Sequence, residues 1–130
     1  MNISESADQL ISKGASDLRF YESFLGNYPE FAEFFRDTDM RRQSNLLISA
    51  LVMIESHYAR QNEGFSAYLK HLGSDHEKRG IAPSHYATWT EAMLNALAAF
   101  HGDDWSDELK QSWDAAIENA VADILSGYVS

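Results

Sequence analysis

Apolar residues recur every three or four positions along most of this 130-residue chain. A period of 3.6 residues places such side chains on one face of an α-helix, whereas a half-buried strand needs strict alternation. The clearest repeat predicts a helix over residues 39–58, with Thr38 or Asp39 as its N-terminal cap. Its predicted buried stripe consists of Leu46, Leu47, Ala50, Leu51 and Ile54. We therefore expect helices packed on helices, an all-α fold.

Three more periodic stretches follow in the second half of the chain. One helix ends before Gly80, the next begins at Pro83 and ends at Gly102, and the last is capped by Ser106. The side chains that their periods turn inward are Phe65, Leu69, Leu72 and His76, then Tyr86, Trp89, Met93, Leu97 and Phe100, and finally Leu109, Trp113, Ala116, Ile117, Ala120, Val121 and Ile124.

The first third of the chain predicts a brief helix over residues 4–12, an aromatic helix that Pro29 ends, and a short turn beyond it. The aromatic and apolar residues of this part are Phe20, Tyr21, Phe24, Leu25 and Tyr28 before the proline and Phe31, Phe34 and Phe35 after it. No repeat or low-complexity segment divides the chain. We therefore expect residues 1–130 to form one domain of six to seven helices.

The composition excludes several classes of function. Twenty acidic and ten basic residues give a formal net charge of -10, which repels nucleic acid and anionic membranes. With no cysteine, the chain has no disulfides, thiolate metal sites or cysteine nucleophile. No apolar run is long enough to span a membrane and no basic, then apolar, leader opens the chain, so a cytoplasmic location is expected.

One of the five histidines differs from the others in its setting. His57 and His101 lie near predicted helix ends, where water or terminal carbonyl groups account for them, and His71 and His85 show no inward pattern. His76 continues an apolar stripe, where an imidazole loses water. That pattern leaves two alternatives open, a structural histidine and the single axial ligand of a haem iron.

Other metal and cofactor motifs are absent from the sequence. No acidic residue lies three positions before a histidine, as di-iron bundles require, and there is no His-Glu-x-x-His, Gly-x-x-x-x-Gly-Lys or Gly-x-Ser-x-Gly. Tyr21 and Gln43 interrupt inward-facing stripes, and each taken alone is explained as a structural residue.

Two segments of the sequence resemble a known family. Residues 20–30 (FYESFLGNYPE), which lead to Phe34 and Phe35, are similar to the second and third helices of bacterial haemoglobins and of the globin domains of flavohaemoglobins. Residues 72–86 (LGSDHEKRGIAPSHY) are similar to that family's proximal segment. The resemblance covers nearly the whole chain, with a shortened first helix. It implies a globin fold around a crevice for haem b, with His76 as the iron ligand.

The resemblance also assigns the residues around the haem. Phe35 would wedge the macrocycle, and Tyr21 matches the distal tyrosine. Gln43 matches the distal glutamine if residues 36–42 carry a two-residue deletion, which puts Leu47 over the iron; without the gap Asn45 takes that place. Further residues expected to contact the cofactor are Leu72, Ile81 and Tyr86, with Arg42, Lys78 and Arg79 as candidates to pair with the propionates.

On the proximal side the chain departs from the flavohaemoglobin pattern. Tyr86 matches the family's proximal tyrosine, but Tyr128 stands where the family has a glutamate. Neither Glu118 nor Asp123 has a helical phase that clearly replaces it. Because a carboxylate that raises the basicity of the imidazole favours cleavage of the O–O bond, its loss weakens the case for peroxidase or dioxygenase chemistry.

The resemblance leaves three functions to distinguish. The first is reversible binding of O2, or of NO or CO, at a ferrous haem on His76. The second is an enzyme, an NO dioxygenase re-reduced by a separate reductase, since 130 residues leave no room for flavin and nicotinamide domains. The third is a globin-like sensor or interaction module. The sequence does not decide the oligomeric state.

Overall fold

The computed structural model describes residues 1–129, which form seven α-helices and three short helical turns and contain no strand. The all-α class predicted from the sequence is confirmed. The helices are α1 (Ile3–Gln9), α2 (Ala15–Asp17), α3 (Phe20–Asn27), α4 (Met40–Ala59), α5 (Glu63–Lys78), α6 (Ser84–His101) and α7 (Asp107–Leu125). The turns are a π-helical turn, η1 (Leu10–Gly14), and two 3₁₀ turns, η2 (Pro29–Phe35) and η3 (Gly102–Asp104).

Local chemistry accounts for where the long helices begin and end. Side chains of Asp39, Asn62 and Ser106 accept hydrogen bonds from the first backbone N–H groups of α4, α5 and α7. The caps at Asp39 and Ser106 were predicted, and the one at Asn62 was not. Gly80 follows α5 with φ +88° and Gly102 follows α6 with φ +57°, and glycine adopts such positive φ angles without strain.

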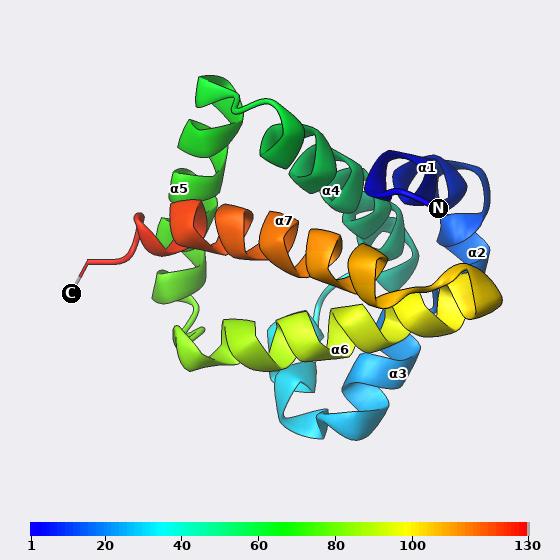
Figure 1. The fold of residues 1–130 in the computed structure, drawn as a ribbon. Coiled ribbons are helices and arrows are strands. Elements are labelled where there is room, and N and C mark those ends of the chain that lie inside the picture. Colours follow the sequence, from blue (N-terminus) through cyan, green and yellow to red (C-terminus); the bar gives the residue numbers. More distant parts are fainter. Residues whose placement is uncertain (130) are drawn as a thin grey trace.

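Helix α7 is the centre of the architecture. It packs against α4, α5 and α6, and Figure 1 shows it running between α4 and α6 and crossing α5. Its Trp113 is fully buried, as are Leu51 of α4 and Leu97 of α6. Helix α3 packs across α6 and continues into η2, which brings the predicted aromatic cluster to the same core. Within residues 1–129, no helix has both the length and the apolar character that a membrane span needs.

Two glycines allow α5 and the end of α7 to approach more closely than side chains would permit. A Cβ atom added to Gly73 would lie 1.8 Å from the backbone oxygen of Ile124. A Cβ atom added to Gly127 would lie 1.9 Å from the backbone oxygen of Lys70. These backbone contacts set the position of His76, one turn beyond Gly73, and of Tyr128, the residue after Gly127.

The N-terminal segment is longer than the predicted helix over 4–12, because α1 continues through η1 into α2 and ends at Asp17. Ser6 anchors this segment. Its buried hydroxyl accepts a hydrogen bond from Trp113 Nε1 (2.9 Å) and lies 2.5 Å from His101 Nε2. The sequence-based explanation of His101 by water or helix-end carbonyls therefore needs correction, since its partner is a serine of another helix. Burial lowers the pKa of His101.

The predicted stripe of α4 is partly wrong. Leu47, Leu51 and Ile54 are buried, but Ala50 is exposed and Leu46 is 52% exposed. Each exposed residue precedes a buried one, which turns it about 100° around the helix, away from the core. Leu46 follows Gln43 by three residues and therefore lies beside it on the surface of α4.

Candidate functional site

His76 lies in the last turn of α5 and is half-buried. Its Nδ1 atom is 2.8 Å from the hydroxyl oxygen of Tyr86, a buried residue in the first turn of α6. The two rings are nearly parallel, at an interplanar angle of 25°. No hydrogen-bond partner of Nε2 is found among residues 1–129. One ring nitrogen is therefore held by the protein, and the other is free to bind a ligand.

The series of hydrogen bonds that begins at His76 continues beyond Tyr86. The hydroxyl groups of Tyr86 and Tyr128 are 2.9 Å apart, and Tyr128 donates a hydrogen bond to the backbone oxygen of Ile81 at 2.8 Å. Tyr128 therefore occupies the position beside Tyr86 that the sequence comparison gave to a glutamate. Within the part of the chain that the structure describes, no carboxylate forms a hydrogen bond with His76 or Tyr86.

The surroundings of His76 and Tyr86 favour the neutral form of both side chains. Burial lowers the pKa of His76, the nearby Arg79 lowers it further, and Asp75 acts in the opposite direction. Burial also raises the pKa of Tyr86, and the hydrogen bond with Tyr128 adds to that effect. At neutral pH the imidazole therefore keeps a lone pair, and the phenol keeps its proton.

A second polar pair joins α3 to α4. Gln43 Nε2 donates a hydrogen bond to the hydroxyl oxygen of Tyr21 at 2.9 Å, while Asn45 is exposed. The ring of Tyr21 meets that of Phe35 edge-on, with 5.2 Å between the ring centres. Burial raises the pKa of Tyr21, and the hydrogen bond from Gln43 opposes this effect. Because its oxygen accepts from Gln43, Tyr21 retains an O–H proton that it can donate to a further acceptor.

The residues expected to contact haem belong to one apolar core. Leu47 and Tyr86 are part of this core, and three half-buried side chains pack against it, Phe35, Leu72 and Ile81. No group of three or more His, Asp or Glu side chains suited to hold a bare metal ion occurs among residues 1–129. One free imidazole nitrogen with apolar surroundings is the donor set that haem requires, since the porphyrin supplies four ligands of its own. The residues present therefore fit haem.

A cavity of about 510 Å³ lies beside Tyr21 and Leu47. Its remaining lining residues come from η1, α2, α3, α4 and the link between α2 and α3, for example Gly14, Leu25 and Ile48. No residue of α5 or α6 contributes to it. The cavity therefore does not reach His76, although it borders Tyr21 and Leu47, two residues that were predicted to lie on the distal side of the haem.

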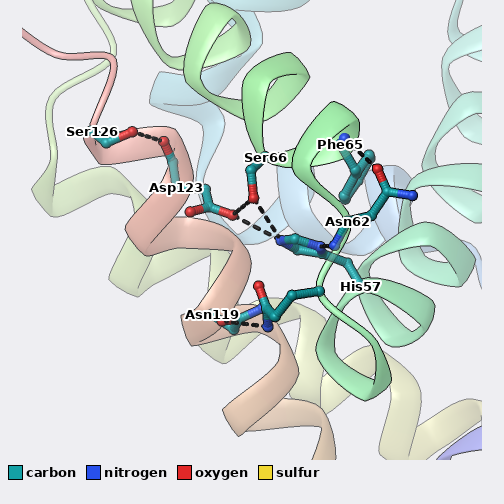
Figure 2. A network of polar contacts seen from close by, with 8 residues as sticks. His57, Asn62, Phe65, Ser66, Asn119, Asp123 and Ser126 are labelled. Atoms are coloured by element: carbon teal, nitrogen blue, oxygen red, sulfur yellow. Dashed lines mark hydrogen bonds and ion pairs between the residues drawn. The ribbon is translucent and has the colours of Figure 1, made fainter.

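His57 departs most clearly from its sequence-based explanation. It was expected to meet water or helix-end carbonyls, but only 1% of it is exposed. Figure 2 shows the contacts that satisfy it: Nδ1 accepts from the backbone N–H of Asn62 (3.0 Å), and Nε2 lies 2.8 Å from Asp123 Oδ2 and 3.2 Å from Ser66 Oγ. The network ties the end of α4 and the start of α5 to α7. By contrast, His71 is exposed, as predicted.

The serine, histidine and aspartate of this network are not arranged for nucleophilic catalysis. Ser66 donates its proton to Asp123 Oδ2 at 2.9 Å, and both side chains meet the same ring nitrogen of His57. A catalytic relay needs the hydroxyl and the carboxylate on opposite nitrogens of the ring. Asp123 is thus committed to His57 and does not replace the missing glutamate behind His76, and Glu118 is exposed.

Removing Asp123 should measure what this network contributes. In Asp123→Ala, the buried N–H of His57 and the hydroxyl of Ser66 lose their acceptor, so we expect the free energy of unfolding to fall by about 1–3 kcal/mol. Urea denaturation followed by circular dichroism gives this value. Glu118→Ala, an exposed carboxylate on the same helix, is the matched control and should stay within about 0.5 kcal/mol of wild type. Equal effects of the two substitutions would contradict a structural role for the network.

Comparison with known proteins identifies the relatives of this chain. The globin family model matches residues 18–124. The chain is 26% identical over 115 residues to the flavohemoprotein of Bacillus subtilis, a match that covers 84% of this chain and 27% of that protein. It is 27% identical over 119 residues to an anaerobic nitrite reductase of Casuarina glauca, with 88% of this chain and 76% of that protein covered.

A shorter match is to a leghemoglobin. Leghemoglobin-1 of Lupinus luteus is 38% identical over 52 residues, which cover 40% of this chain and 34% of that protein. The matches thus span about a quarter of the flavohemoprotein and a third of the leghemoglobin. No solved structure gives a significant match.

Proposed function

This chain belongs to the globin family, and we propose that it binds haem b through Nε2 of His76 and binds O2 reversibly on the opposite face of the iron. The observation that carries the proposal is the imidazole itself, which is held at Nδ1 by Tyr86 and has no partner on Nε2 among residues 1–129. Haem, when bound, supplies an iron with an open position for a diatomic gas. NO and CO are alternative ligands for the same position.

The pair Tyr21 and Gln43 supports O2 as the ligand. Bound O2 carries partial negative charge, and both side chains have hydrogens that they can donate to it. Gln43 accounts for the orientation of Tyr21, because its amide occupies the phenolic oxygen and leaves the O–H proton available. In this proposal Leu47 and Phe35 are among the apolar residues that would contact the haem. Asn45, which is exposed, has no part in it.

Three exposed cations are proposed to pair with the haem propionates. Arg42, Lys78 and Arg79 are exposed, and none forms an ion pair within the described part of the chain. Arg42 lies beside Gln43 at the start of α4, and the other two follow His76 at the end of α5. They therefore flank both of the helices that would hold the haem.

Gas binding is favoured over an oxidative enzyme by the groups behind His76. A carboxylate there would raise the basicity of the imidazole and favour cleavage of the O–O bond. The chain instead places two phenols and a backbone carbonyl behind the ring. None of these is a negative charge at neutral pH. We therefore propose a carrier of O2 and assign no catalytic residue.

The test is the absorbance spectrum of the protein supplied with haemin. We expect a Soret band, a ferrous form without a sixth protein ligand, and a spectrum that changes when O2 is added and returns when O2 is removed. A protein that stays colourless with added haemin would overturn the proposal. Repeated conversion of NO to nitrate in the presence of a cellular reductase would instead identify an NO dioxygenase.

Replacing Tyr21 with Phe should speed the release of O2. The substitution keeps the ring but removes the donated hydrogen bond, so we expect the O2 dissociation rate to rise by about tenfold, which corresponds to the loss of one hydrogen bond to a partly charged group. Flash photolysis or stopped-flow mixing with CO measures this rate. Tyr58→Phe, a residue that is 44% exposed, is the control and should leave the rate unchanged. An unchanged rate in Tyr21→Phe would exclude Tyr21 as the distal donor.

A further inference from the structure

The geometry behind His76 points to a role for Tyr128 that the family resemblance does not supply. We propose that Tyr128 is a positioning residue that acts through Tyr86 to fix the tautomer of His76, so that Nδ1 carries the proton and Nε2 carries the lone pair. The inference deepens the proposed function, because only a lone pair on Nε2 can bind iron.

The series of hydrogen bonds behind His76 ends at a group that can only accept. The backbone oxygen of Ile81 is an acceptor only, so the single hydroxyl proton of Tyr128 is used in the 2.8 Å hydrogen bond to it. Tyr128 must then accept in its 2.9 Å contact with Tyr86. Tyr86 is therefore the donor in this contact, and its single hydroxyl proton points to Tyr128.

The direction of these hydrogen bonds continues to the imidazole. Because Tyr86 has already donated its proton, it can only accept in the 2.8 Å contact with Nδ1 of His76. Nδ1 must therefore carry a hydrogen, and a neutral imidazole then has its lone pair on Nε2. A backbone carbonyl thus sets the state of the ring through two phenols. This assignment needs no charge on any member of the chain.

The backbone holds Tyr128 in the position that this role requires. On one side, Gly127 packs directly on the backbone of Lys70 in α5. On the other side, the N–H of Val129 donates a hydrogen bond to Glu77 Oε1 at 2.9 Å. Both anchors belong to α5, the helix that carries His76. The acceptor is held as well, since the N–H of Ile81 donates to the backbone oxygen of His76 at 3.0 Å.

Without the hydroxyl of Tyr128, the donor and acceptor roles of Tyr86 and His76 would no longer be fixed. In Tyr128→Phe the proton of Tyr86 no longer has an acceptor on its far side, so it can turn and donate to Nδ1. His76 would then carry its proton on Nε2, the atom proposed to bind iron. The substitution keeps the aromatic ring and removes one oxygen atom, so it changes the hydrogen bonding without emptying the core.

The test uses the haem-free protein labelled with 15N at histidine. At about pH 8, where an imidazole is neutral, the nitrogen chemical shifts of His76 distinguish protonated from unprotonated nitrogens. We expect wild type to show a proton on Nδ1. In Tyr128→Phe, the ratio of the Nδ1–H to the Nε2–H tautomer should fall by about tenfold, which is roughly the effect of one hydrogen bond. Tyr58 is exposed and takes no part in these hydrogen bonds, so Tyr58→Phe should leave the ratio as in wild type.

Tyr86→Phe separates the two tyrosines. If Tyr86→Phe alters the tautomer ratio while Tyr128→Phe does not, Tyr86 alone determines the tautomer of His76, and the proposal is overturned. A proton on Nε2 in the wild-type protein would overturn it as well. Because these readings need no haem, they are independent of the proposed function: a protein that keeps the predicted tautomer and yet refuses haemin would refute haem binding alone. In the loaded protein, Tyr128→Phe should also lose haemin faster than Tyr58→Phe.

Discussion

Replacing His76 with Ala is expected to weaken haemin binding by about a hundredfold or more and to change the Soret band of any haemin that remains bound. Loss of groups that merely orient a metal ligand already costs ten- to a hundredfold in metal affinity, and this substitution removes the ligand itself. The apolar side chains that we expect to contact haem would still retain some haemin. Titration with haemin, followed by absorbance, measures both effects.

The control lies on the same helix. His71 is also in α5, but its side chain is 77% exposed and its nearest carboxylate is Asp75 at 3.5 Å. His71→Ala should therefore bind haemin as wild type does. Adding imidazole to His76→Ala should restore the wild-type spectrum, because the free base can occupy the space that the side chain leaves. A Soret band in His76→Ala identical to that of wild type would show that another group binds the iron.

The helices could be predicted from the sequence because their cause is local. An apolar period of 3.6 residues and a capping side chain are both contained in a short window, and Asp39 and Ser106 cap their helices as expected. The same reasoning missed the edges of the buried faces. Leu46 and Ala50 were assigned to the core of α4, and their exposure depends on which helices cover α4, which no short window contains.

His57 shows a signal that was present but given too little weight. It lies three residues after Ile54 and so continues the stripe of Leu51 and Ile54, just as His76 continues the stripe of Leu72. Its place near a helix end favoured water as its partner. Its actual partner, Asp123, is 66 residues away, and only the packing of α7 on α4 and α5 brings the two together.

The series of hydrogen bonds behind His76 could be predicted in part. The resemblance drew attention to His76, Tyr86 and Tyr128, and the structure joins these three through consecutive hydrogen bonds. The last member, the backbone oxygen of Ile81, has no side-chain signature and could not be read from the sequence. The direction of the whole chain depends on that atom, so the tautomer of His76 could be inferred only from the structure.

The close contact between α5 and α7 makes Gly73 the position where a small change should do the most damage to the fold. In Gly73→Ala the added methyl group would meet the backbone oxygen of Ile124, and backbone cannot move aside as a flexible side chain can. We expect the free energy of unfolding to fall by about 3 kcal/mol or more, at the upper end of the effects of overpacking. Separation of the two helices would also displace His76, so haemin affinity should fall with stability.

A second glycine shows that the effect belongs to the contact and not to the residue type. Gly26 lies in α3, and a Cβ atom added there meets nothing within 4 Å. Alanine favours a helix over glycine by about 1 kcal/mol, so Gly26→Ala should leave the protein as stable as wild type or slightly more stable. Urea denaturation of both variants, with haemin titration of each, makes the comparison. If Gly73→Ala were as stable as Gly26→Ala, the helices would not meet at Gly73, and the placement of Tyr128 behind His76 would lose its backbone support.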